Sequence, residues 1–235
     1  MTYLGLALCL VGPAQPLTPE PSPPPAVVVV QPAERYYMVL FGAQSVPFQG
    51  RYTHTWATFV RTQVTEKGET PVAIDTTSWM PKTLNIRPLA LRPEPGANLT
   101  LEQTFKWVAT FDGRVSKWGP YEIDRLRYAE FMERKAELES GTVQYRAIGG
   151  PRRRPDIVNC GQSFARGTPE VGQRYLYPTP SPGENGTGEL AERYLKKGDL
   201  LGNGATHEWI FQVINADQYP STTRQPGEKV PYLRR

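Results

Sequence analysis

The chain has 235 residues, of which 39% are hydrophobic and 21% are charged, and its formal net charge is +4. This length suits one domain, because domains cluster at about 100–150 residues and often reach 200. The small positive excess of charge is too weak to indicate a nucleic-acid partner, so we expect none. We also expect the protein to be a monomer. The 24 prolines predict a loop-rich domain with short strands, because proline cannot donate to a strand ladder and stops helices.

The first 33 residues have the composition of a targeting segment followed by a spacer. An apolar run around Cys9 has the length of a signal-peptide core and is too short to span a bilayer. We therefore interpret residues 1–14 as a signal segment and the proline-rich residues 15–33 as an extended linker. This pattern predicts a secreted protein, or one of the periplasm or cell envelope, in which residues 34–235 form the working domain.

Sequence patterns after residue 34 predict an α+β fold with an antiparallel sheet and helices packed on it. Five stretches have the apolar, β-branched and aromatic content of strands: 36–41, 52–62, 71–79, 99–111 and 142–148. The second and third of these are joined by a turn and form a hairpin. Three stretches favour helices: 121–140, and shorter ones that begin at 159–160 and near Thr206.

Cys160 is the candidate nucleophile, because it would be the one cysteine left after removal of the signal segment. Thiol chemistry needs a base that takes the thiol proton and a polar group that orients the base. We expect His54 to be the base, since it lies in a predicted strand, whereas His207 lies at the surface of a predicted helix start. A helix that begins at Cys160 would lower the pKa of the thiol.

The returning strand of the hairpin offers an orienting group for His54, with Asp75 as the first choice and Thr77 as the second. No metal site is predicted, since two histidines without close metal-ligand spacing do not make a zinc set. No cofactor is expected either, because no phosphate loop or dinucleotide fingerprint occurs. The Arg152–Arg154 run is interpreted as a solvated loop.

The stretch from His54 to Phe59, His-Thr-Trp-Ala-Thr-Phe, followed far downstream by Asn159-Cys160, resembles the circularly permuted papain-like proteins. This group includes lecithin–retinol acyltransferase-like proteins and relatives of the NlpC peptidases. The element Ser-Trp-Met-Pro at 78–81 is similar to one in uncharacterised bacterial members. The resemblance implies a permuted papain-like architecture, with Cys160 as nucleophile, His54 as base and Asp75 as the third polar group.

The resemblance implies hydrolysis or acyl transfer at an amide or ester through an acyl-Cys160 intermediate. The substrate would be a peptide, peptidoglycan or a lipid amide. A sortase-like arrangement with Arg166 ranks lower, because residues 158–160 lack the threonine-rich strand end of that group. The alternative of a different class is a non-catalytic envelope module that uses the fold as a binding or scaffolding surface. The Cys160–His54 separation discriminates between them, because a base must lie within hydrogen-bond reach.

Overall fold

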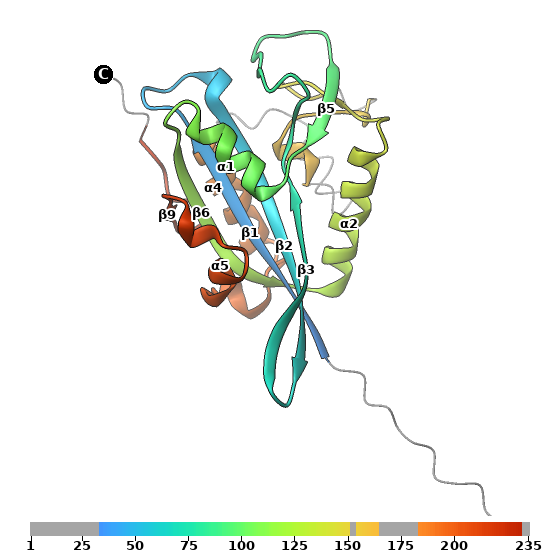
Figure 1. Ribbon diagram of the computed structural model, residues 1–235, viewed down its shortest axis with the longest axis vertical. Coiled ribbons are helices and arrows are strands. Elements are labelled where there is room, and N and C mark those ends of the chain that lie inside the picture. The colour runs from blue at the N-terminus through green and yellow to red at the C-terminus, as the bar shows by residue number, and fades with distance from the viewer. Residues whose placement is uncertain (1–32, 151–153, 165–182, 232–235) are drawn as a thin grey trace, which may run out of the picture. The chain divides into compact units, whose positions relative to one another are not determined.

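The structure is a computed structural model that describes residues 33–150, 154–164 and 183–231. Contacts divide the chain into Met1–Gln31 and Pro32–Arg235, and all described residues belong to the second unit. The predicted signal segment, nearly all of the predicted linker, Arg152, Arg153 and Arg166 lie outside the described residues. The described part has two sheets and several helices, which confirms the α+β class (Figure 1).

The larger sheet has five strands in the order β3-β2-β1-β6-β9. The neighbours among the first four are antiparallel, and the short β9 adds to β6 in parallel. The strands are β1 (Ala33–Gln44), β2 (Thr53–Thr65), β3 (Gly68–Thr77), β6 (Arg114–Ile123) and β9 (Thr222–Thr223). The predicted hairpin is thereby confirmed as β2 and β3, whereas β6 was not predicted as a strand.

A smaller sheet in the order β4-β5-β7-β8 continues from the end of the hairpin. Its strands are β4 (Trp79–Pro81), β5 (Glu94–Asn98), β7 (Gln144–Tyr145) and β8 (Ile157–Val158). The α-helices in the described ranges are α1 (Leu101–Ala109), α2 (Arg125–Glu139), α4 (Glu184–Lys196) and α5 (Trp209–Val213). Short 3-10 turns include η1 (Gly50–Tyr52) and η2 (Gly161–Ser163).

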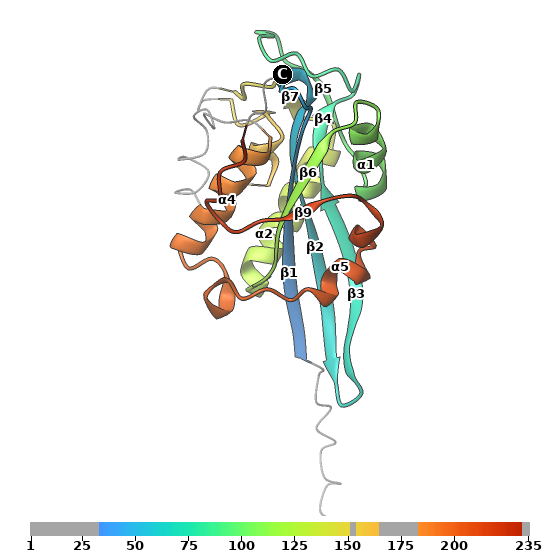
Figure 2. The same cartoon turned by 90° about the vertical axis from the view of Figure 1, so that its left-hand side faces the viewer.

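Helices cover both faces of the larger sheet (Figure 2). Helices α1 and α5 pack on one face, here named the α1 face, and α2 and α4 pack on the other, the α4 face. Successive side chains of a strand point to opposite faces, so β1 feeds both cores. Its Tyr37, Val39 and Phe41 enter the α1-face cluster, whereas Met38 and Leu40 enter the α4-face cluster.

The predicted strand at 99–111 is wrong, because these residues form α1. Thr100 caps that helix by accepting a hydrogen bond from the Gln103 amide at 3.2 Å, and the Gln103 side chain accepts one from the Thr100 amide at 2.9 Å. This reciprocal pair provides hydrogen-bond acceptors for two backbone amides at the start of the helix. In a strand these amides would need acceptors on a neighbouring strand. The apolar residues then face the sheet at helical spacing.

The predicted helix at 121–140 begins only at Arg125. Tyr121 to Ile123 belong to β6, and the Asp124 side chain caps the helix by accepting from the Arg127 amide at 2.7 Å. Thr206 forms an isolated bridge with Tyr121 and is not the cap of a helix.

Helix α4 lies unusually close to the backbone of β1. A Cβ atom on Gly42 would come within 2.6 Å of Thr187 Oγ1, so only glycine allows this approach. At the first residue of α4, the fully buried Glu184 carboxylate accepts hydrogen bonds from Arg114 and from the Ser116 hydroxyl. A buried carboxylate requires such partners, so this cluster fixes where α4 begins against β6.

Strand β3 forms an edge of the larger sheet, and among the described residues it pairs only with β2. Val72 and Ile74 on this strand are about half-exposed. The register with β2 shifts between Arg61 and Thr62, and Pro71, which has no N–H group, lies at the shift. The edge therefore carries both a bulge and a missing donor.

Candidate binding pocket

His54 is sealed in the core on the α1 face of the sheet. Its Nε2 atom lies 2.9 Å from Ser78 Oγ, which also accepts a hydrogen bond from Thr104 Oγ1 at 2.7 Å. The ring stacks on Trp56 with centroids 5.4 Å apart and meets Trp107 edge-on at 5.8 Å. Burial lowers the pKa of His54 to about 3, so the imidazole is neutral near pH 7.

Cys160 lies on the other face of the sheet, next to Thr55. The amides of Thr55 and Gly161 and the Thr55 hydroxyl favour its thiolate, but the larger effect is burial, which raises the pKa of the Cys160 thiol. Only a three-residue 3-10 turn follows Cys160, so the predicted pKa-lowering helix is absent from this position.

The predicted Cys160–His54 pair does not form. Thr55 and His54 are successive residues of β2, so their side chains point to opposite faces. Cys160 interacts with Thr55, whereas the hydrogen bond of the imidazole goes to Ser78 and its Nδ1 atom has no partner in the described part of the chain. The sheet itself separates the thiol from the expected base.

Asp75 does not orient His54 either. It is paired in register with Phe59, further along β2, and its carboxylate meets Lys135 Nζ at 3.4 Å. Asp75 therefore helps to fix α2 against the sheet. Thr77, the second choice, makes no hydrogen bond to the imidazole, and the residue that does so is Ser78.

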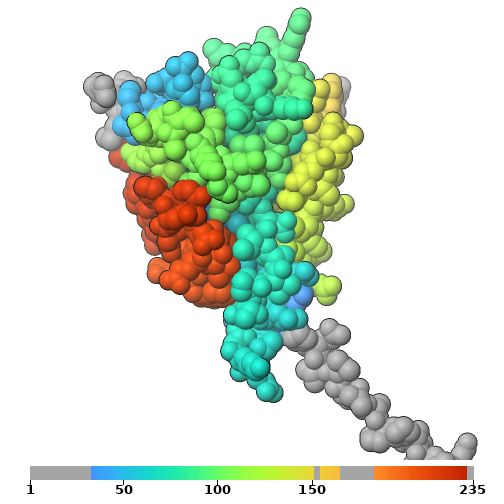
Figure 3. Space-filling view, viewed as in Figure 1, coloured from blue at the N-terminus to red at the C-terminus, as the bar shows by residue number. Residues whose placement is uncertain are grey.

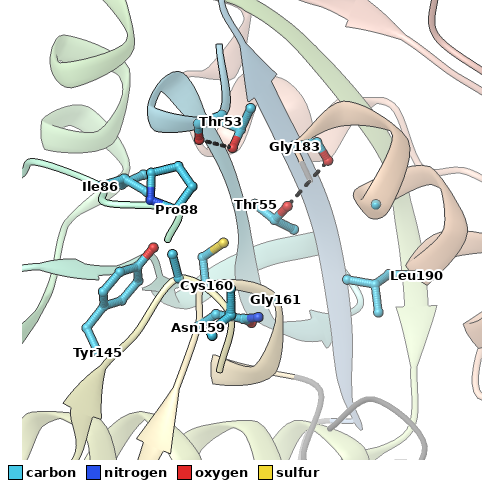
Figure 4. Close-up of a pocket in the computed structure, with 14 residues that line it drawn as sticks. Thr53, Thr55, Ile86, Pro88, Tyr145, Asn159, Cys160, Gly161, Gly183 and Leu190 are labelled. Carbon is cyan, nitrogen blue, oxygen red and sulfur yellow. Dashed lines mark hydrogen bonds between the residues drawn. The ribbon is translucent and has the colours of Figure 1, made fainter. Parts of the chain in front are cut away.

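A pocket of about 220 Å³ opens beside Cys160 (Figure 4). It lies between the start of β2, the smaller sheet, the start of α4 and the loop of residues 82–93. The described lining residues carry no charged side chain; they are Gly50, Thr53, Thr55, Ile86, Pro88, Tyr145, Ala147, Ile148, Asn159, Cys160, Gly161, Gly183, Gly186 and Leu190. An uncharged, largely apolar lining suits a neutral ligand.

The Tyr145 hydroxyl points into this pocket without a hydrogen-bond partner among the described residues (Figure 4). Tyr145 is only 2% exposed. Burial raises the pKa of its hydroxyl well above the ordinary value, and the nearby Cys160 raises that pKa further. By contrast, the hydroxyls of Thr53 and Thr55 donate to the carbonyls of Gly50 at 2.8 Å and Gly183 at 3.4 Å. The phenol thus has a buried ring and a hydroxyl at the pocket wall that could donate to a ligand. Sequence reasoning missed it, because an unsatisfied hydroxyl is visible only in the tertiary structure.

Comparisons of the chain with protein-family models, with curated proteins and with solved structures found no match. The likeness to permuted papain-like proteins therefore stays a prediction. Within the described ranges, no helix is both long and apolar enough to cross a bilayer. The same residues contain no group of three or more side chains suited to holding a metal ion.

Proposed function

We propose that this protein is a binding module whose ligand enters the pocket beside Cys160. The observation that carries the proposal is the Tyr145 hydroxyl, which faces the pocket from a buried side chain and has no hydrogen-bond partner among the described residues. This oxygen is not one of the fully buried polar atoms without a partner in the described part of the chain, so it is accessible from the pocket. A ligand with an acceptor at this position would gain one hydrogen bond, which contributes about 0.5–1.5 kcal/mol to binding.

The lining defines the chemistry of the ligand. Ile86, Pro88 and Leu190 favour an apolar body, and the Tyr145 hydroxyl favours a carbonyl oxygen as the polar atom. The volume of about 220 Å³ lies below the range of about 300–1,000 Å³ that holds drug-sized ligands. We therefore propose a short, neutral group that carries an amide or ester, such as the end of an acyl chain or a peptide side chain.

Hydrolysis through Cys160 is the weaker candidate. It requires a proton acceptor within reach of the thiol, and the described lining residues include neither a histidine nor a carboxylate. The finer assignment to the permuted papain-like group rested on a Cys160–His54 pair. Without that pair we retain the α+β class, together with a non-catalytic role in the envelope or outside the cell, which rests on the N-terminal sequence pattern.

Hexanamide and hexanoate are matched probes for this proposal, because they share an apolar body and differ in charge. Titration followed by two-dimensional NMR should show hexanamide shifting the amide signals of Ala147 and Ile148, and hexanoate binding more weakly. Tyr145→Phe should weaken hexanamide binding by about two- to tenfold, the loss of one hydrogen bond. Tyr128→Phe on α2 is the control and should leave the affinity unchanged. No shift at either amide, or equal affinity in Tyr145→Phe, contradicts the proposal.

A further inference from the structure

Large apolar side chains are exposed mainly at one end of the domain, where the pocket lies. The described residues include ten exposed large hydrophobics, and six of these belong to three loops at this end. We name these six the apolar end: Val46, Phe48, Leu84, Leu89, Leu91 and Ile148. The exposed fraction reaches 90% for Leu89 and 78% for Leu91.

The three loops of the apolar end adjoin one another. Gly50 in the β1–β2 connection packs on Pro88, since a Cβ atom on this glycine would lie 3.3 Å from the proline ring. Pro88 and Ile148 line the same pocket. Arg146 donates to the Leu91 carbonyl at 3.1 Å, which joins the third loop to the second. The exposed side chains therefore belong to one surface around the pocket.

The loop of residues 82–93 holds its leucines outward on a fixed backbone. Ile86 is buried, and Trp107 Nε1 donates to the Leu84 carbonyl at 3.2 Å. At the far end of the loop, Arg87 pairs with Glu94 at 2.8 Å. Figure 3 shows this part of the chain projecting from the top of the domain. A convex tip of this kind fits a flat, soft surface better than a groove.

The charges at the apolar end are mainly positive. Lys82 and Arg92 are exposed, and neither makes an ion pair within the described ranges. The acids of these loops are already paired: Glu94 with Arg87, and Asp156 with Arg154 at 2.7 Å. Lys82 and Arg92, beside the exposed leucines, therefore complement a surface with anionic groups outside and an apolar layer beneath.

We propose that the apolar end docks onto an anionic lipid bilayer. Leu89 and Leu91 enter the interface, and Lys82 and Arg92 contact lipid phosphates. Apolar burial and attraction to anionic lipid add in such binding. Docking goes beyond the ligand pocket proposed above, and it would bring the pocket next to the lipid layer.

Sedimentation of the full chain with vesicles tests the docking. Vesicles of phosphatidylcholine with about 30% phosphatidylserine should bind the protein, and pure phosphatidylcholine vesicles should bind it less. Leu89→Ser with Leu91→Ser should weaken binding at least tenfold, since each leucine loses its burial. Lys82→Gln with Arg92→Gln should weaken it roughly 25-fold, at about fivefold per cation. Leu126→Ser is the control, because Leu126 is 71% exposed on α2, outside the apolar end.

Three results of the vesicle experiment would overturn the docking proposal. They are absence of binding to the anionic vesicles, equal binding by the double leucine variant, and an equal loss in Leu126→Ser. Light scattering must also show a monomer, because an association of copies that the leucine variant abolishes would make this end a protein interface instead. The N-terminal residues are the same in every variant and cannot account for a difference between them. Hexanamide binding by the double leucine variant should be unchanged, so failure of docking and failure of the pocket are distinguishable.

Discussion

His54 Nε2 lies 2.9 Å from Ser78 Oγ, and this hydrogen bond joins β2 to the residue that follows β3. The indole rings of Trp56 and Trp107 pack against the imidazole. The serine hydroxyl is itself bonded to Thr104 of α1, so the imidazole connects the sheet to the helix above it. A residue that was expected to take a proton from a thiol instead ties two elements together in its neutral form.

The free energy of unfolding should fall as the pH decreases from about 7 to 5. The pKa of His54 is lowered in the folded state to about 3 from an ordinary 6.5, so the unfolded chain binds the proton first. The stability that His54 contributes is complete above pH 6.5 and is lost below it, with a slope approaching about 1.4 kcal/mol per pH unit. Urea unfolding at several pH values measures this slope.

His54→Gln should flatten that slope between pH 7 and 5, whatever its effect on absolute stability. His207→Gln is the matched control, because it removes the other, partly exposed histidine and leaves His54 in place. An unchanged slope in His54→Gln would contradict the prediction.

Cys160 should react slowly with iodoacetamide at pH 7. In a Cys9→Ser background, the midpoint of rate against pH should lie above about 8.5, since burial raises the pKa of the thiol. Thr55→Val should move the midpoint higher, because the Thr55 hydroxyl favours the thiolate. His54→Ala should leave the midpoint unchanged. A midpoint below 7 that rises in His54→Ala would restore the catalytic pair.

Glu184→Gln should lower the free energy of unfolding by about 1–3 kcal/mol, because the partly exposed Arg114 loses a charged hydrogen-bond acceptor that is fully buried. Replacing both residues by methionine should cost less than this single change, which a double-mutant cycle in urea would measure. Glu189→Gln lies on the same helix and breaks a pair with the mostly exposed Lys229. Its cost should stay below about 1 kcal/mol, and equal losses at the two positions would contradict the prediction.

Removal of residues 1–32 should leave the melting temperature within about two degrees, because a proline-rich tract contributes little to unfolding free energy. In cells, the same deletion should retain the protein in the cytoplasm, which fractionation would detect. A large fall in melting temperature would show that this tract stabilises the domain. Unaltered fractionation would contradict the targeting prediction alone.

The hairpin of β2 and β3 and most of helix α2 were predictable, because their apolar residues recur at the spacing of two or of 3.6. Helix α4 was not predicted, because the buried residues of its first turn are polar or small and not large and apolar. They are Glu184, Asn185, Gly186 and Thr187. Small residues there serve the close approach to Gly42, which only the folded arrangement requires. The strand interpretation of 99–111 overlooked the Thr100–Gln103 capping pair, which the sequence does contain.

Of the residues predicted for the site, Cys160 lies in the candidate pocket, whereas His54 and Asp75 do not. Cys160 does line a pocket, but no sequence pattern says on which face of a sheet a distant loop will settle. The alternation along β2 already separates Thr53 and Thr55 from His54 and Trp56. Choosing between these two sets required the position of Cys160, which depends on how β8 pairs with β7.

The edge of β3 has a consequence for self-association. The outer edge of β3 has no partner strand in the described part of the chain, and such an edge with half-exposed Val72 and Ile74 would be a template on which further chains could add strands. Pro71 removes one donor there, and the bulge beside it twists the edge away from a flat partner. Pro71 and the bulge together thus disfavour the addition of a further strand from another copy of the chain at this edge.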